Sequence, residues 1–238
     1  LIGRSRRERL VPELSTVHHP LYQLRRTPFH ARTSQLCLPH NWRRWGGCLA
    51  VGSYDLGLDR EYWAIRNHAA LIDISPLIKY EITGRDAARL LHRLTPRDIH
   101  RMQVGQVYYT GWCDDEGKLL DDGTVTRIGE QNFRLTAAEP QYRWLAMNAV
   151  GMQVQVTELT EQMAALSLQG PKSRAILNLA CEQPVDALKY FRMAFNRIAG
   201  KAVSVSRTGY TGDLGFEIWM DAADALVIWD ALMTAGHD

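Results

Sequence analysis

Cysteine is scarce in this chain, and long hydrophobic runs are absent from it. The 238 residues include four cysteines, Cys37, Cys48, Cys113 and Cys181, whose spacing fits neither a zinc site nor a disulfide framework. No apolar stretch approaches the length that crosses a membrane, and the N-terminus lacks the apolar centre of a signal peptide. These absences predict reduced thiols, no bound metal, no membrane partner, and a location in the cytoplasm or an organelle matrix.

The net charge is also small, at +2, but the charged residues are unevenly distributed along the chain. Residues 1–44 hold nine arginines and two acidic residues, which leaves the remainder at −5. The first ten residues carry four of those arginines, Arg4, Arg6, Arg7 and Arg9. A short arginine cluster in a terminal segment is usually solvated, so we interpret residues 1–24 as a basic N-terminal segment and predict no nucleic-acid partner.

Hydrophobic residues make up 46% of the chain, enough to bury a core in one large domain or two modest ones. Periodicity favours two halves, because two similar units each open with a strand, a glycine and a helix. They are KYEITGRDAARLLHRL, from Lys79, and MAALSLQGPKSRAILNL, from Met163, with Gly84 and Gly170 at equivalent bends. The composition and the repeat together predict an α+β fold.

The first unit continues with predicted strands near residues 106–111, 124–128 and 133–136, a helix from Pro140, and a strand over residues 153–158. This order of strand, helix, strands, helix and strand is that of the split βαβ, or ferredoxin-like, arrangement. We therefore expect two ferredoxin-like halves.

The second unit follows the same order but lacks its last strand. Strands are predicted near residues 202–207 and 216–220, then a helix over residues 222–235 that Asp221 caps and Gly236 ends. Either the N-terminal segment supplies the missing strand or the chain is a fragment. We favour the fragment. Separately, the first residue is leucine rather than methionine, which predicts a processed or trimmed N-terminus.

The predicted domains follow from this repeat. Residues 25–72 together with residues 157–238 form a discontinuous first domain. Residues 73–156 form the second, and residues 1–24 precede both.

A glycine-rich stretch in the second unit, SRTGYTGDLGFEIW at residues 206–219, is typical of a strand, a turn and a second strand. Gly209, Gly212 and Gly215 either permit positive φ in plain turns or let the backbone pass close to a ligand. Glu217 favours the ligand, because an unpaired carboxylate inside an apolar strand is unfavourable and a ligand donor group would relieve it.

Other polar residues give weaker indications. Asp98, in LTPRDIH, either performs proton chemistry or has a turn or cap role. Asp121 and Asp122 are adjacent on a predicted strand and point to opposite faces, so we reject them as an acid and base pair. The GPK sequence at residues 170–172 lacks the full phosphate-loop pattern, and Pro171 at a first helical turn explains it. The eight histidines show no metal-binding helical spacing.

Several motifs, in order and in register from about Thr27 to the end, resemble the aminomethyltransferase, or glycine cleavage T-protein, superfamily of folate-dependent one-carbon transferases. They are RTPFHAR, AALIDISP, LTPRDI, VGQVYYT, DDEGKLLDDGTV, AALSLQGPKSRAIL and SRTGYTGDLGFEI. The resemblance implies three domains in a cloverleaf around tetrahydrofolate. Two are ferredoxin-like halves and the third is a C-terminal β-barrel, which this sequence is expected to lack.

The same resemblance implies roles for individual residues. Asp98 matches the catalytic aspartate beside folate N5 and the transferred carbon. Glu217 matches the glutamate that binds the pterin amino and ring NH groups, through charge-assisted hydrogen bonds. Tyr210 matches a tyrosine of the loop that packs at the folate. Segments that line the pocket contain Tyr109, Tyr190 and Phe191.

The predicted activity is transfer of a one-carbon group from a small substrate to folate N5, and the resemblance adds a lipoyl carrier protein as a candidate partner. Residues 73–77 and 136–140 depart from the T-protein pattern, which implies different substrate-facing chemistry. One alternative is therefore a folate-dependent demethylase of methylamine, sulfonium or methoxy compounds. Others are a non-catalytic folate-binding accessory protein, although a KGCYxGQE-type motif is missing from the sequence, and a detached module of a flavin methylamine dehydrogenase.

Overall fold

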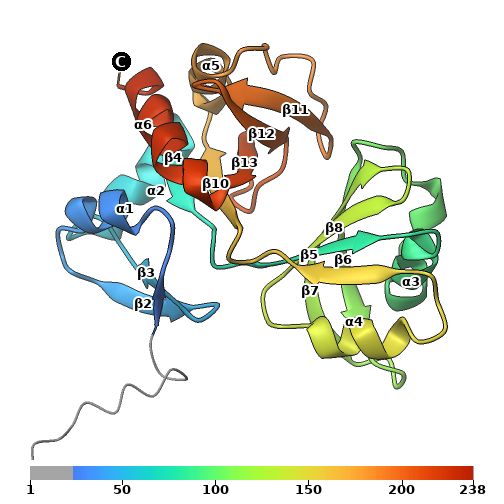
Figure 1. Cartoon of the computed structure of the whole chain (residues 1–238). Helices are drawn as coiled ribbons and strands as arrows, with labels where there is room; N and C mark the ends of the chain where they lie inside the picture. The colour runs from blue at the N-terminus through green and yellow to red at the C-terminus, as the bar shows by residue number, and fades with distance from the viewer. Residues whose placement is uncertain (1–23, 238) are drawn as a thin grey trace, which may run out of the picture.

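The computed structural model describes residues 24–237, which form three sheets and the helices around them (Figure 1). The basic cluster Arg4, Arg6, Arg7 and Arg9 lies outside the described residues. Within residues 24–237, no helix is both long enough and apolar enough to span a bilayer.

A small three-stranded sheet comes first along the described chain. Its order is β1-β3-β2, built from β1 (Arg25–Arg26), β2 (Trp42–Trp45) and β3 (Cys48–Val51), with α1 (His30–Leu36) after β1. Phe29, just before α1, is fully buried, and its ring centroid lies 5.7 Å from that of Trp229. This contact joins the small sheet to the core of the C-terminal part.

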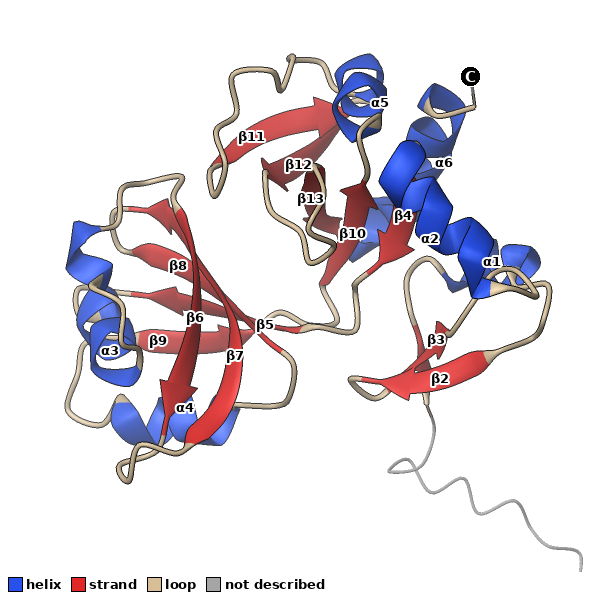
Figure 2. Cartoon of the chain, turned by 180° about the vertical axis from the view of Figure 1, so that it is seen from behind, coloured by secondary structure: helices blue, strands red, loops and turns tan. Residues whose placement is uncertain are grey.

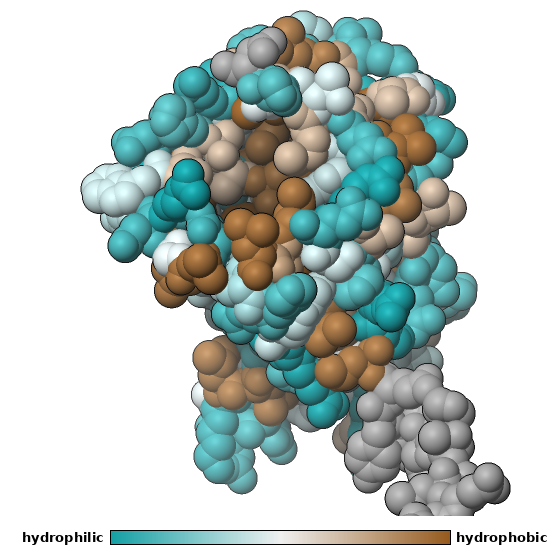
Figure 3. Space-filling view, turned by 90° about the vertical axis from the view of Figure 1, so that its left-hand side faces the viewer, coloured by the Kyte–Doolittle hydropathy of each residue, from teal (hydrophilic) through white to brown (hydrophobic). Residues whose placement is uncertain are grey.

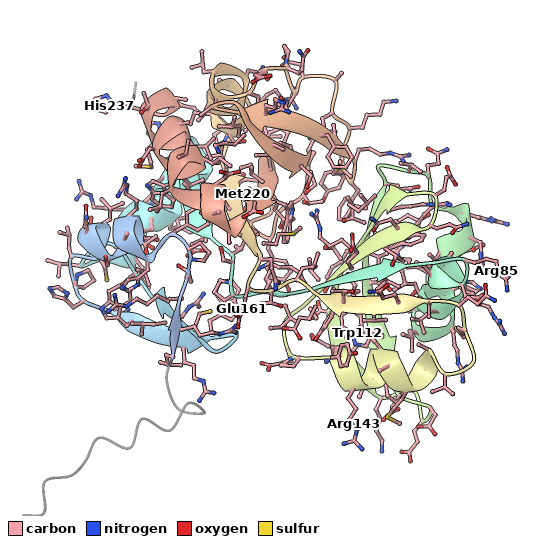
Figure 4. All side chains as sticks on the ribbon, in the orientation of Figure 1. Arg85, Trp112, Arg143, Glu161, Met220 and His237 are labelled. Atoms are coloured by element: carbon pink, nitrogen blue, oxygen red, sulfur yellow. The ribbon has the colours of Figure 1, made fainter. Side chains whose placement is uncertain are left out.

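The first repeat unit forms a five-stranded antiparallel sheet in the order β6-β7-β8-β5-β9. Its elements are β5 (Ile78–Thr83), α3 (Ala87–Leu94), β6 (Val107–Cys113), β7 (Leu119–Gly129), β8 (Asn132–Ala137), α4 (Tyr142–Asn148) and β9 (Gln155–Glu158), with a 3-10 turn, η2 (Ile99–Arg101), after α3. The predicted element order is confirmed. Trp112 lies in the interior of this unit (Figure 4), buried in the core that Tyr108 packs against.

The second repeat unit forms another five-stranded antiparallel sheet, in the order β11-β12-β13-β10-β4. Its elements are α2 (Leu58–Asn67), β4 (Ala70–Asp73), β10 (Met163–Gln169), α5 (Ser173–Ala180), β11 (Met193–Ile198), β12 (Lys201–Ser206), β13 (Gly215–Asp221), η3 (Ala222–Asp224) and α6 (Ala225–Ala235). The β12–β13 hairpin was predicted, whereas β11 was not. The predicted cap is present, since the Asp221 side chain accepts a hydrogen bond from the Ala223 N–H at 2.8 Å.

β4 provides the strand that the sequence pattern left missing from the second unit. The explanation of that missing strand by a fragment was therefore wrong. β4 pairs antiparallel with β10, with Leu166 opposite Asp73. It occupies the place that β9 occupies beside β5 in the other sheet. Without β4, β10 would present an edge of unpaired backbone groups, and pairing removes that edge. The predicted division at residues 72/73 and 156/157 stays a prediction.

The repeat has a physical basis in its two bends. Gly84 and Gly170 have φ of +118° and +125°, a region that side chains rarely adopt. A Cβ at either position would lie 2.5 Å from a backbone oxygen, that of Gln153 or His68 respectively. Both bends therefore require glycine for the same two reasons.

The two large sheets have their helices on opposite sides of the molecule, α3 and α4 on one and α5 and α6 on the other (Figure 2). The faces without helices turn toward each other, and Arg134 on β8 reaches Ser204 on β12 across the gap. The backbones also meet at one end. The Val107 N–H donates to the Phe191 carbonyl at 3.0 Å, and the Met193 N–H donates to the Gly105 carbonyl at 2.7 Å.

Candidate functional site

Strand alternation places polar side chains in the cleft between the two sheets. On β13, Phe216, Ile218 and Met220 pack into the core beneath α5 and α6. The residues between them, Glu217 and Trp219, therefore point the other way, toward the sheet of the first repeat unit. β8 shows the same pattern, with its apolar residues in the core beneath α3 and Arg134 on the cleft side.

Glu217 is a half-buried carboxylate with one hydroxyl partner. The Thr208 hydroxyl donates to Glu217 Oε2 at 2.6 Å, and Thr208 Oγ1 lies 2.7 Å from Ser206 Oγ. Burial raises the pKa of Glu217, and this effect is opposed by the Thr208 hydrogen bond and by the charge of Arg134. The carboxylate therefore retains unused acceptor capacity inside the cleft.

The glycines of the hairpin loop are explained by a buried glutamine. A Cβ at Gly209 or at Gly215 would lie 2.1 or 2.0 Å from Oε1 of Gln169, which is fully buried. Gln169 Oε1 accepts a hydrogen bond from Thr211 at 3.0 Å, and Gln169 Nε2 donates to the Thr208 carbonyl at 3.2 Å. The two glycines thus let the loop close onto Gln169, which positions Thr208 beside Glu217.

The predicted aromatic residues gather where the two sheets meet. The Tyr109 hydroxyl donates to Asp122, and this hydrogen bond, with smaller contributions from burial, the Asp122 charge and Tyr210, raises the pKa of Tyr109 to about 12. Tyr190 lines a cavity of about 310 Å³ together with the hairpin loop. Its ring centroid lies 4.6 Å from that of Phe191.

Asp98 lies apart from this group. It precedes η2, and its carboxylate is 48% exposed and pairs with Arg101 Nε at 3.1 Å. No side-chain contact recorded for residues 24–237 joins Asp98 to Glu217 or to the four aromatic residues. Its link to them is indirect, because the neighbouring Arg97 Nε donates to the Tyr109 carbonyl at 3.2 Å. The catalytic role of Asp98 stays a prediction.

The rejected pair, Asp121 and Asp122, does point to opposite faces. Asp121 Oδ2 accepts hydrogen bonds from the backbone N–H groups of Ala138 and Glu139, at 3.1 and 3.0 Å. Asp122 instead accepts from Tyr109. One carboxylate therefore holds a backbone turn while the other holds a tyrosine.

Sequence reasoning missed three residues of the site, namely Thr208, Gln169 and Arg134. Arg134 could have been found, because a charged residue between Phe133 and Leu135 is the same signal that identified Glu217. Arg134 is only 5% exposed. Its Nη1 donates to Ser204 Oγ at 3.2 Å, and burial lowers its pKa to about 10.

A second depression lies away from the cleft. An apolar groove of about 440 Å³ runs between α2 and α6 on the face shown in Figure 3, where hydrophobic side chains surround a hollow. The sequence-predicted site residues are not among those that line it.

Comparison with known proteins identifies this architecture. The sequence matches the family model of the GCVT N-terminal domain over residues 32–238. It is 31% identical over 208 residues to an aminomethyltransferase of Bacillus cytotoxicus, covering 83% of this chain and 57% of that protein. It is 35% identical over 227 residues to a trimethylamine-oxide aldolase of Ruegeria pomeroyi, covering 90% of this chain and 28% of that protein.

A solved structure agrees with the sequence matches. The glycine cleavage system aminomethyltransferase T from Bartonella henselae superposes with a TM-score of 0.79 at 27% identity, covering 89% of this chain and 57% of that one. The chain spans about half the length of the curated aminomethyltransferases that it matches.

Proposed function

The chain belongs to the GCVT N-terminal domain family, and on that premise we propose that it provides the folate-binding part of an enzyme that transfers a one-carbon group from a small substrate to N5 of tetrahydrofolate. Its relatives named aminomethyltransferase support this activity. The expected lipoyl carrier partner and the expected cytoplasmic or matrix location stay predictions.

The proposal rests on the burial of the Glu217 carboxylate and on its single hydrogen-bond partner. A half-buried carboxylate with one hydroxyl partner, in a cleft, needs further donors. The pterin amino and ring NH groups are donors of the required kind, so this residue fits tetrahydrofolate. Charge-assisted hydrogen bonds to them would favour the ionised carboxylate and offset its burial.

The other residues are assigned supporting roles. Thr208 orients the Glu217 carboxylate, and Gln169 holds the loop that carries Thr208. We assign Tyr109, Tyr190, Phe191 and Tyr210 to the pocket wall. Asp98 is proposed to position or relay a proton at the reacting nitrogen. When bound, tetrahydrofolate supplies the nitrogen that accepts the one-carbon group, and orientation of the two reactants provides much of the rate.

The test is tetrahydrofolate binding, measured by isothermal titration calorimetry. Glu217→Gln keeps the size of the side chain and removes its charge, and we expect at least a ten-fold weaker affinity. Glu182→Gln, an exposed acid in the loop after α5, is the matched control and should bind like the wild type. Equal affinities for the wild type and Glu217→Gln would refute the pterin assignment.

A second candidate is demethylation of a methylated amine by the same folate site. The similarity to a trimethylamine-oxide aldolase over 90% of the chain favours it. So does the departure at residues 136–140, where Thr136 Oγ1 lies 2.6 Å from Thr124 Oγ1 on the cleft side of the sheet of the first repeat unit. Mass spectrometry of folate after incubation with dimethylamine, or with an aminomethylated lipoyl carrier, distinguishes the two donors.

A further inference from the structure

The loop at residues 207–214, between β12 and β13, carries two residues of the proposed folate site. Thr208 lies at its start and Tyr210 lies near its middle. The Thr211 hydroxyl donates to Gln169 Oε1 at 3.0 Å and fixes the loop to its own sheet, but the Tyr210 side chain is 89% exposed. The position of Tyr210 therefore depends on what holds the outer part of the loop.

An ion pair holds this loop from outside its own sheet. Arg66, in the last turn of α2, donates from Nη1 to Asp213 Oδ2, although the two residues are 147 positions apart in the chain. Their side chains are 37% and 27% exposed, whereas every other ion pair among the described residues includes a side chain that is at least 45% exposed. Ion pairs that are partly withdrawn from water are screened less. Arg66 and Asp213 therefore form the ion pair best suited to fix a loop.

The guanidinium of Arg66 is itself held in place on its helix. Tyr62 lies four residues before Arg66 on α2, a spacing that makes two side chains neighbours on a helix surface. The guanidinium carbon lies 5.2 Å from the centroid of the Tyr62 ring, within the range of a cation–π contact. Hydrogen bonds to Tyr62 and to Asp213 also raise the pKa of Arg66. The guanidinium is therefore charged at any physiological pH and is directed at the loop.

The other side of the loop reaches the sheet of the first repeat unit. Tyr210 hydrogen-bonds to the Tyr109 side chain on β6, and this contact adds to the larger effect of Asp122 in raising the pKa of Tyr109. The loop is thus held by α2 on one side and contacts β6 on the other. Because α2 leads directly into β4, the segment that completes the sheet of the second repeat unit also holds this loop.

We propose that Arg66 is a positioning residue for tetrahydrofolate binding, because its ion pair with Asp213 holds the loop so that Tyr210 lies at Tyr109 before the ligand arrives. This role rests on the proposed folate function, and Arg66 itself does not touch the ligand. Ordering a loop during binding costs free energy, so a loop that is already ordered gives a tighter complex. If only a fraction of the molecules holds the loop in place, the apparent Kd rises by the inverse of that fraction.

Calorimetry with tetrahydrofolate tests this role. Arg66→Met removes the ion pair and should raise the Kd about five-fold, whereas Arg66→Lys keeps the charge and should restore part of the loss. The control is Arg60→Met, which breaks the 2.9 Å ion pair with Asp55 just before the same helix and should bind like the wild type. In a Tyr210→Ala background, Arg66→Met should change the Kd by less than about two-fold, because Arg66 acts through the position of Tyr210.

Chymotrypsin measures the hold on the loop without folate. Cleavage after Tyr210 requires local opening, so its rate reports the fraction of molecules whose loop is open, and Arg66→Met should be cleaved there about five-fold faster than the wild type. Arg60→Met should be cleaved at the wild-type rate. Cleavage after Tyr142, an exposed residue at the start of α4, is the internal reference and should be equal in all three proteins. Mass spectrometry assigns the cleaved bonds, and thermal melting verifies folding.

The outcomes separate this role from the proposed function. Unchanged cleavage after Tyr210 or unchanged tetrahydrofolate affinity in Arg66→Met overturns the positioning role, as does an equal loss of affinity with and without Tyr210. In that case a wild type that binds tetrahydrofolate through Glu217 loses only the present inference. A wild type that binds no tetrahydrofolate loses the proposed function and, with it, the folate role of Arg66. If Arg66→Met does not fold, Asp213→Asn breaks the same ion pair and replaces it in both measurements.

Discussion

The two large sheets have the same strand order but carry opposite charges at the same position of the repeat. In one sheet, Glu217 pairs with Ser167, three residues before Gly170. In the other, Arg134 pairs with Glu81, three residues before Gly84. Both side chains face the cleft, and each affects the pKa of the other.

This difference teaches how one fold, used twice, yields an asymmetric site. The backbone repeat determines which positions face the cleft, and the side chains at those positions then differ freely, since neither is needed for the core. The sheets also differ in the origin of their outer strand, which is β9 from within the unit in one case and β4 from before it in the other.

The largest expected difference in catalytic effect is between Asp98, which follows α3 in one half, and Glu182, which follows α5 in the other. Asp98→Asn should lower turnover about 100- to 10,000-fold with little change in tetrahydrofolate affinity, because it removes a group that acts on a proton. Steady-state kinetics and calorimetry measure the two effects. Glu182→Gln, in the loop after α5, is the control and should change neither. Equal losses in turnover and affinity for Asp98→Asn would contradict its catalytic role.

The equivalent positions Arg134 and Glu217 can be given the same charge by reversing the charge of Arg134. Arg134→Glu places a second carboxylate opposite Glu217 in a buried site, and the free energy of unfolding should fall by about 3–5 kcal/mol. Urea denaturation measures this change. The double variant Arg134→Glu with Glu217→Gln should recover more stability than Glu217→Gln gains in the wild-type background, whereas a double variant equal to the sum of the two single changes would show that the two side chains do not interact.

The two equivalent glycines should respond alike, though not equally. Gly170→Ala should lower the free energy of unfolding by about 3 kcal/mol and Gly84→Ala by about 2 kcal/mol, because the three nearest backbone atoms lie 2.5, 2.8 and 2.9 Å from the added Cβ at Gly170 but 2.5, 3.1 and 3.3 Å from it at Gly84. Gly151 also has a positive φ, of +79°, but open space around it, so Gly151→Ala should lower the free energy of unfolding by about 1 kcal/mol. If all three substitutions have the same effect in urea denaturation, the close backbone approach is unimportant.

The smallest effect should appear in the dependence of stability on pH. Burial raises the pKa of Glu217 above its unfolded value of 4.5, so its contribution to stability is complete below pH 4.5 and is lost as the pH rises through the folded pKa. Glu217→Gln should therefore be more stable than the wild type at pH 7, and this advantage should shrink below pH 4.5. A constant difference between pH 4 and pH 7 in urea denaturation would contradict the raised pKa.

Local patterns were sufficient for much of the fold. Alternation on β8 and β13 was visible in the sequence, as were the paired glycines and the Asp221 cap, because each depends on residues close together in the chain. The same patterns missed β11, whose residues 193–198 are half exposed and lack clear alternation. They also left the edge beside β10 unfilled, since the strand that fills it pairs Asp73 with Leu166, residues far apart in the chain.

The candidate site was predicted in part. Glu217 was recognisable because a carboxylate in an apolar strand is unusual wherever the strand lies. The requirement for glycine at Gly209 and Gly215 was not recognisable, because it depends on contact with Gln169. Gln169 lies on another strand and has no distinguishing sequence pattern. The Tyr109 and Tyr210 pair likewise depends on how two sheets dock.

The sequence by itself determined the order of strands and helices in the first repeat unit, the two obligatory glycines and the one anomalous acid, because periodicity, φ limits and the unfavourable burial of charge act over a few residues. Only the tertiary structure decided that β4 completes the sheet of the second repeat unit, and that Glu217 and Arg134 hold matching positions. Those facts depend on strand register and on the docking of one sheet against the other, and both are determined by contacts between residues far apart in the chain.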